Sequence, residues 1–192
     1  MVRLTKIYTR SGDAGRTRLG DMSETDKHDL RVDAYGDVDE ANSAIGLARS
    51  ALGTAHTLDR VLSTIQNDLF DVGADLCVPE SDQPREWEPL RVKADQVDAL
   101  ETHIDRLNAD LEPLNSFILP AGSEASARLH LARTVCRRAE RKVSALLASG
   151  AEVNSEVLRY LNRLSDLLFV MARTANENGK ADVLWVPGGQ RR

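Results

Sequence analysis

Hydrophobic residues along this chain recur mainly at spacings of three and four, the period of an amphipathic helix. Five stretches carry the pattern, over residues 37–52, 57–76, 93–108, 123–149 and 154–178. Gly53 ends the first stretch, and three prolines interrupt the chain between the second and third. Five amphipathic helices joined mostly by short links predict an all-α bundle in a single domain.

Polar residues and the loss of helical periodicity indicate where the helical part of the chain begins and ends. Asp37 and Glu40 have the spacing of a capping box, so the first helix is expected to start there. Before it, residues 3–8 are expected to be extended and residues 9–21 to form a loop. After the fifth helix, the segment ADVLWVPGGQRR, residues 181–192, reads as an extended, then frayed, tail.

The longest stretch, 123–149, carries two different faces. Its expected apolar arc comprises Ala125, Leu129, Ala132, Val135, Cys136, Ala139, Val143 and Leu146. Arg133, Arg137, Glu140 and Arg141 lie on the other side, and Arg138 follows Arg137 directly. Crowded guanidinium groups repel one another unless an anion neutralises them. The face is therefore either a solvated surface with salt bridges, partly neutralised by Glu140, or a polyanion site, because arginine forks suit phosphate oxygens.

The loop TRSGDAGRTRLGD, residues 9–21, could cradle phosphate. Its three glycines allow backbone N–H groups to approach an anion, and Thr9, Ser11 and Thr17 add hydroxyl groups. It matches neither a Walker A loop nor a dinucleotide-binding motif. An ordinary polar surface loop, with Lys27 as a solvated lysine beyond it, explains the spacing equally well.

The connection 114–123 is unusually apolar for a loop, with Phe117, Ile118 and Leu119 in sequence. Two interpretations remain open. These side chains could plug the end of the bundle, or they could form a wall for an apolar or flat ligand.

Composition excludes several classes of protein. With 42% hydrophobic and 29% charged residues in 192, the chain can bury a core. A net charge of −5 argues against nucleic-acid binding, which requires a basic surface. No stretch approaches about 18 uninterrupted apolar residues, and no signal peptide is recognisable. Cys77 and Cys136 lack metal-ligand spacing and suggest a reducing compartment, so a cytoplasmic protein without a membrane partner is expected.

The sequence offers few groups for metal or covalent chemistry. His28, His56, His103 and His130 form none of the Glu-x-x-His pairs of a di-metal bundle. No serine or cysteine has a convincing partner that would make it a nucleophile. We therefore predict neither a protein metal site nor a covalent intermediate.

Four segments in order, TRSGDAGRTRLGD, AYGDVDEANSAIG, ARTVCRRAER and NRLSDLLFVMAR, resemble the PduO-type family of ATP:cob(I)alamin adenosyltransferases. The resemblance implies a five-helix bundle, usually a homotrimer with active sites between neighbouring subunits. Such enzymes move the 5′-deoxyadenosyl group of ATP onto cob(I)alamin and release triphosphate. It also implies an ATP-binding segment over 1–30, a helical bundle over 37–178 and a tail over 179–192.

The resemblance also implies individual site residues. The ATP site would comprise Thr9, Arg10, Ser11, Gly12, Thr17, Arg18, Lys27, Arg137, Arg138, Ala139, Glu140, Arg141 and Asn162. Arg133 and Arg137 would act in catalysis, and Asp39 would pair with Arg133 across the subunit boundary. Phe117 would face the cobalamin, where an aromatic of this family displaces the lower axial base. Arg10, Ala14 and Ala121 depart from the usual family residues, although Arg10 keeps the positive charge of the lysine that it replaces.

The expected chemistry agrees with the missing nucleophile. Cob(I)alamin is itself a strong nucleophile, so the protein must orient two ligands and stabilise triphosphate. Arginines and Mg²⁺ would do this, with the metal held mainly by phosphate oxygens and water. An adenosylcobalamin-dependent enzyme could accept the product. The alternatives are an ATP-sensing helical bundle without chemistry and a scaffold whose arginine face docks an acidic partner.

Overall fold

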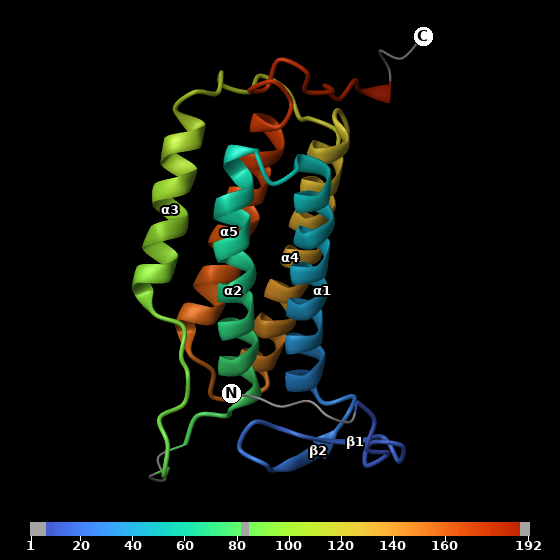
Figure 1. The fold of residues 1–192 in the computed structure, drawn as a ribbon, viewed down its shortest axis with the longest axis vertical. Helices are drawn as coiled ribbons and strands as arrows, with labels where there is room; N and C mark the ends of the chain where they lie inside the picture. Colours follow the sequence, from blue (N-terminus) through green and yellow to red (C-terminus); the bar gives the residue numbers. More distant parts are fainter. Residues whose placement is uncertain (1–6, 82–84, 189–192) are drawn as a thin grey trace.

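A computed structural model describes residues 7–81 and 85–188 of the chain. The described residues form α1 (Leu30–Leu52), α2 (Thr57–Cys77), α3 (Ala94–Asn108), α4 (Glu124–Ala148) and α5 (Ser155–Thr174), preceded by β1 (Arg16–Arg18) and β2 (Glu24–Asp26). The five helices run along the long axis of one bundle (Figure 1). The predicted all-α class is confirmed.

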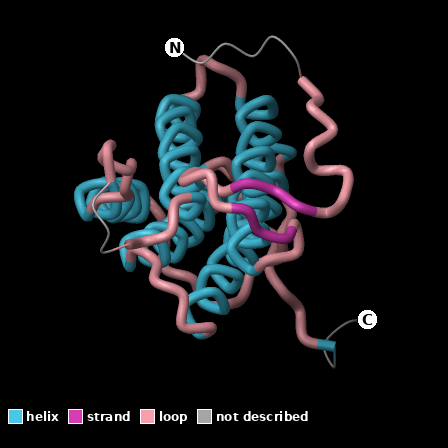
Figure 2. Tube along the Cα trace, turned by 90° about the horizontal axis from the view of Figure 1, so that it is seen from below, coloured by secondary structure: helices cyan, strands magenta, loops and turns pink. Residues whose placement is uncertain are grey.

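The helices pack in a fixed order around the core. α1 contacts α2 and α4, α4 contacts α5, and α3 packs mainly on α5 at the outside of the bundle (Figure 1). The hairpin of β1 and β2 lies across one end of the helices, as the view along the bundle shows (Figure 2). The connection after α3 and the tail after α5 lie at the opposite end.

The predicted apolar stripes form the core. Ile45, Leu62, Leu129, Leu161 and their neighbours on four helices are fully buried. Each such side chain stabilises the fold by about 1.5–3 kcal/mol relative to an exposed position. Of the predicted arc on α4, Ala125 alone is half-buried and the other seven residues are buried. The helical period therefore placed the inner faces correctly.

The predicted start of the first helix at Asp37 is wrong. α1 begins at Leu30, and the side chain of Asp29 caps it by accepting a hydrogen bond from the N–H of Arg31. Arg31 is buried because its guanidinium donates to the carbonyls of Leu76 (2.8 Å) and Glu152 (3.1 Å). A buried arginine in the first turn interrupts the apolar pattern. The pattern therefore did not reveal the first two turns of the helix.

The fifth helix also ends earlier than predicted, at Thr174 instead of residue 178. Glu177, Asn178 and Gly179 have φ angles of 55°, 53° and 83°, so the chain turns through the left-handed region. This turn reverses the chain and directs the tail back across the end of the bundle.

The N-terminal loop contains a structure that the sequence pattern did not predict. β1 and β2 pair antiparallel, with Thr17 opposite Thr25. The N–H of Gly20 donates to the carbonyl of Cys77 at 2.8 Å, which ties the hairpin to the end of α2. Most of the predicted extended piece, residues 3–8, lies outside the described part of the chain.

The tail pairs with the apolar connection at the other end of the bundle. The N–H of Leu119 donates to the carbonyl of Val183 (2.7 Å), and that of Trp185 donates to the carbonyl of Phe117 (2.8 Å). Ile118 and Leu184 form an antiparallel bridge between these bonds. The tail is extended as predicted, and residues 189–192 lie outside the described part of the chain.

In the part of the chain that the structure describes, none of the helices has the length and hydrophobicity needed to cross a membrane.

Candidate functional site

Two arginines on α4 point into a pocket between α4 and α5. The pocket has a volume of about 240 Å³ and is lined by Arg133, Arg137, Ser165, Asp166, Phe169 and Val170. Among the described residues, neither arginine forms an ion pair with a carboxylate. The Nε atom of Arg133 is buried and has no hydrogen-bond acceptor there. We call this the arginine pocket.

The arginine pocket has a net positive lining, because two guanidinium groups face the single carboxylate of Asp166. Burial lowers the pKa of Arg133 from its ordinary value, and the positive charge of Arg137 lowers that pKa further. A bound polyanion would offset both effects, because it supplies opposite charge and accepts the unused hydrogen bonds. The polyanion interpretation of the α4 face therefore suits Arg133 and Arg137.

Arg138 belongs to a different group of contacts, although it follows Arg137 directly. Its Nε donates to Asp37 Oδ2 at 2.9 Å, and its Nη2 contacts Glu40. These are the two acidic residues that the sequence suggested as a capping box. Lys142 contacts Asp33 one turn further along α4. The salt-bridged interpretation therefore applies to this side of α4, which is tied to α1.

Two other predicted ATP residues on α4, Ala139 and Arg141, do not line the arginine pocket. Ala139 is buried in the core, so its side chain cannot reach a ligand. Arg141 donates to the carbonyl of Arg137 at 3.0 Å and forms no ion pair among the described residues.

Glu140 accepts a hydrogen bond from Asn162 Nδ2 at 2.8 Å. Glu140 and Asn162, predicted from separate motifs, are thus brought together.

A second polar hollow lies beside the N-terminal hairpin. Its volume is about 370 Å³, and it is lined by Ser11, Gly12, Arg16, Thr17, Arg18, Glu24 and Lys27. Five of the seven residues predicted here for ATP line it, and Arg16 was missed. A Cβ atom at Gly12 would lie 3.0 Å from Lys27 Nζ, so a larger residue there would crowd the lysine. The loop therefore places a lysine beside glycine backbone, as a phosphate cradle requires.

The remaining two predicted loop residues do not line this hollow. Thr9 Oγ1 and Ser11 Oγ share a hydrogen bond of 2.8 Å. The guanidinium of Arg10 lies over the ring of Tyr8, 5.6 Å from its centroid, and Arg10 has a φ of 65°. Thr9 therefore positions Ser11, whereas Arg10 points toward Tyr8.

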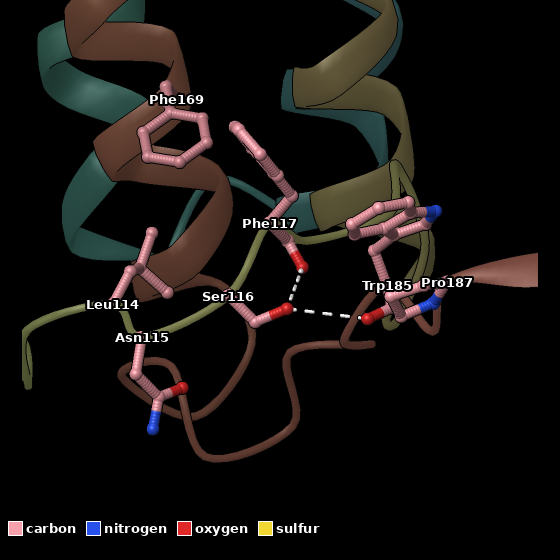
Figure 3. A pocket seen from close by; sticks show the side chains of 7 residues that line it. All are labelled: Leu114, Asn115, Ser116, Phe117, Phe169, Trp185 and Pro187. Carbon is pink, nitrogen blue, oxygen red and sulfur yellow. Dashed lines mark hydrogen bonds between the residues drawn. The ribbon is translucent and has the colours of Figure 1, made fainter. Parts of the chain in front are cut away.

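A large cavity opens at the end of the bundle opposite the hairpin. Its volume is about 870 Å³, and it is lined by Leu114, Asn115, Ser116, Phe117, Phe169, Trp185 and Pro187 (Figure 3). Phe117 is 78% exposed and meets Trp185 edge to face, with ring centroids 6.1 Å apart. Plugging the bundle is therefore the wrong interpretation for Phe117, since its ring faces the cavity.

Several lining residues were not predicted from the sequence. Phe169 lines both the cavity and the arginine pocket, so the two hollows share a wall. The buried ring of His130 meets Phe169 edge to face at 6.0 Å, and burial lowers the pKa of His130. The sequence offered two signals: an aromatic on the polar side of the fifth helical stretch, and a tryptophan in the short apolar run VLWVP of the tail.

Asp39 lies in an apolar groove between α1 and α2. The groove has a volume of about 530 Å³ and includes Asn42 and Phe70, a phenylalanine that is 72% exposed. Asn42 Oδ1 is buried without a hydrogen-bond donor among the described residues. Asp39 is exposed and makes no ion pair in the described chain, and it does not contact Arg133 of the same chain. The predicted Asp39–Arg133 pair is therefore absent within one chain and remains a prediction for two chains.

In residues 7–81 and 85–188, no group of three or more His, Cys, Asp or Glu side chains has the arrangement of a metal site.

Comparison with known proteins shows which family has this arrangement. The family model for cobalamin adenosyltransferase matches residues 7–175. A corrinoid adenosyltransferase of Mycobacterium tuberculosis is 54% identical over 192 residues, covering 99% of this chain and 97% of the relative. One from Bacillus subtilis is 46% identical over 182 residues, covering 93% and 91%.

A solved structure agrees over nearly the same length. A variant PduO-type ATP:corrinoid adenosyltransferase from Lactobacillus reuteri, complexed with cobalamin and ATP, has a TM-score of 0.87 and 39% identity, covering 95% of this chain and 100% of its own. Sequence and fold thus agree, and the chain belongs to the cobalamin adenosyltransferase family.

Proposed function

We propose that this protein transfers the 5′-deoxyadenosyl group of ATP to the cobalt of cob(I)alamin, giving adenosylcobalamin and triphosphate. The single observation that carries the assignment is the wall shared through Phe169. An arginine pocket suited to triphosphate adjoins a large, aromatic-lined cavity suited to a flat corrinoid. The solved relative from Lactobacillus reuteri holds both ligands.

The reaction needs little chemistry from side chains. The electron pair of cob(I)alamin forms the bond to C5′ of ATP, and the C5′–O bond breaks with its electron pair on the departing triphosphate. Arg133 and Arg137 stabilise the charge that accumulates on the leaving group. Mg²⁺ enters with ATP as part of the substrate. The cavity wall around Phe117 holds the corrinoid and excludes water from its lower face.

We also propose that the sites are shared between the subunits of a homotrimer. The hairpin hollow and the Phe117 cavity lie at opposite ends of the bundle (Figure 1). α4 alone has 25 residues, or roughly 37 Å at 1.5 Å per residue. One ATP molecule cannot span that distance to complete a site within one chain. A neighbouring chain that supplies the missing half, through the Asp39 groove, would satisfy both Asp39 and Arg133.

The proposal extends to a cytoplasmic location and to an enzyme that accepts the product. Both cysteines of the chain are free thiols, which supports the reducing cytoplasm. Adenosylcobalamin is an enzyme cofactor, so an adenosylcobalamin-dependent enzyme is the proposed acceptor.

The direct test is optical. Protein, ATP, Mg²⁺ and chemically reduced cobalamin should together give the absorption spectrum of an alkylated corrinoid, and triphosphate should appear in equal amount. A control without ATP should leave cob(I)alamin unalkylated. ATP binding without alkylation would support the ATP-sensing bundle. Absence of binding to either ligand would support the scaffold that docks an acidic partner.

Replacing Asp39 with alanine should weaken assembly and activity together. The change would leave the partly buried Arg133 of the neighbour without its partner, which costs more than an intact pair contributes. Sedimentation velocity at assay concentration should show smaller species, with reduced turnover. Asp105→Ala, an exposed aspartate on α3, is the matched control and should remain assembled. The proposal fails if Asp39→Ala is a fully active monomer, or if the parent is one.

A further inference from the structure

A buried polar cluster lies at the C-terminal end of α5. Arg173, Asn176 and Asp182 belong to it, and the side chains of Arg173 and Asp182 are only 7% and 3% exposed. Arg173 Nε donates to Asp182 Oδ2 at 2.9 Å, and Asn176 Nδ2 donates to Asp182 Oδ1 at 3.2 Å. Both carboxylate oxygens are therefore used. No residue of the cluster lines the cavity or the arginine pocket.

The cluster holds both ends of the connection that carries Phe117. Arg173 Nη2 donates to the carbonyl of Glu112 at 2.9 Å, before the connection. At the other end of the connection, Asn176 Oδ1 accepts a hydrogen bond from the N–H of Ser123, the N-cap residue of α4, at 2.9 Å. Gly122 has a φ of 103°, and a Cβ atom there would collide with the side-chain amide of Asn176. The glycine is thus required for this close approach.

The same cluster fixes the start of the tail. Asp182 directly precedes Val183, whose carbonyl accepts the first hydrogen bond from the connection, and Trp185 donates the second to Phe117. Successive side chains in an extended segment point to opposite sides, so a slip of one residue would turn Trp185 away from Phe117. Anchoring Asp182 therefore sets which tail side chain faces the cavity.

We propose that Arg173, Asp182 and Asn176 are positioning residues that lock the register between the tail and the Phe117 connection, and so shape the corrinoid side of the site. The consequence for catalysis rests on the proposed function, whereas the register lock does not. An ion pair suits this task because its charges and hydrogen bonds are satisfied in only one alignment of the tail with the connection. An apolar contact would be satisfied in several alignments.

The test uses Asp182→Asn in the full chain. Amide hydrogen exchange at Leu119 and Trp185 should accelerate at least about tenfold, since weaker local structure opens more often. With ATP and cob(II)alamin, the four-coordinate electron paramagnetic resonance signal should decrease, and KM for the corrinoid should rise while KM for ATP changes little.

A buried carboxylate at the other end of the bundle provides the control. Asp75 accepts hydrogen bonds from Arg91 (2.8 Å) and Asn154 (2.7 Å), so Asp75→Asn removes a charge from a comparable cluster. It should lower thermal stability but leave exchange at Leu119 and Trp185 and the four-coordinate signal as in the parent.

Each result decides one part of the proposal. Unchanged exchange in Asp182→Asn would overturn the lock, whatever the activity. Faster exchange, with an unchanged KM for the corrinoid and an unchanged four-coordinate signal, would show that the register lock does not shape the corrinoid side of the site. A parent that fails to alkylate cobalamin would reject the proposed function and leave the exchange result to decide the lock. If Asp182→Asn does not fold, Arg173→Met with Asp182→Leu removes both charges while keeping packing, and should show the same faster exchange.

Discussion

Replacing Arg137 with alanine is expected to slow adenosyl transfer by one to two powers of ten in a protein that remains folded. Arg137 lies in the arginine pocket, is exposed, and has no carboxylate partner among the described residues. Its removal therefore breaks no ion pair of the fold. A hydrogen bond to a charged group contributes about 1.5–3 kcal/mol, and each 1.36 kcal/mol of barrier corresponds to about a tenfold change in rate.

Two further variants test whether the charge of Arg137 or the shape of its guanidinium group matters for the rate. Arg137→Lys keeps the charge but loses the planar fork that can bind two phosphate oxygens, so its rate should fall between those of parent and alanine variant. Arg106→Ala removes an arginine in the last turn of α3 that lines neither the arginine pocket, the cavity nor the hairpin hollow, and it should leave turnover unchanged. The measurement is single-turnover alkylation of cob(I)alamin at saturating ATP. Parental turnover in a folded Arg137→Ala protein would return this side of α4 to the solvated, salt-bridged interpretation.

Periodicity predicted most of the fold because the core is built from aliphatic side chains at helical spacing. It failed where a polar group is buried or a turn is left-handed. Arg31 is buried by carbonyl acceptors from two distant segments, and no local pattern reveals those partners. The end of α5 depends on Glu177 and Asn178 entering the left-handed region, which the sequence permits without requiring.

The candidate site was predictable in the same uneven way. Helical spacing placed Arg133, Arg137 and Arg138 on one side of a helix, and an apolar loop drew attention to Phe117. The individual roles of these residues came from the family resemblance. Consecutive arginines could not be separated by sequence, because the acidic partners of Arg138 lie about 100 residues earlier on α1. Trp185 stands out in the sequence as an aromatic in the tail, but its place beside Phe117 follows only from the pairing of the tail with the connection.

Replacing Phe117 with alanine should keep ATP binding and assembly but abolish the four-coordinate cob(II)alamin species. While its lower axial base donates to cobalt, cob(II)alamin is difficult to reduce, and a large aromatic can displace the base and exclude water. The proposed role suits Phe117, because this residue is 78% exposed and its ring faces the cavity that Phe169 also lines (Figure 3). Truncating it should reduce folding stability only slightly, since it removes mainly the edge-to-face pair with Trp185, worth about 0.5–1.5 kcal/mol.

The decisive measurement is electron paramagnetic resonance of cob(II)alamin with ATP on parent and variant. Turnover should fall most when reduction must take place on the protein, and least when cob(I)alamin is supplied already reduced, because the aromatic acts before alkylation. Trp87→Ala removes another partly exposed aromatic that does not line the cavity, and it should keep the four-coordinate signal. Phe117→Tyr keeps the bulk of the ring and should retain part of the signal. If Phe117→Ala gave the parental signal, the ring would be only a cavity wall, and the lower base would have to be displaced by another group.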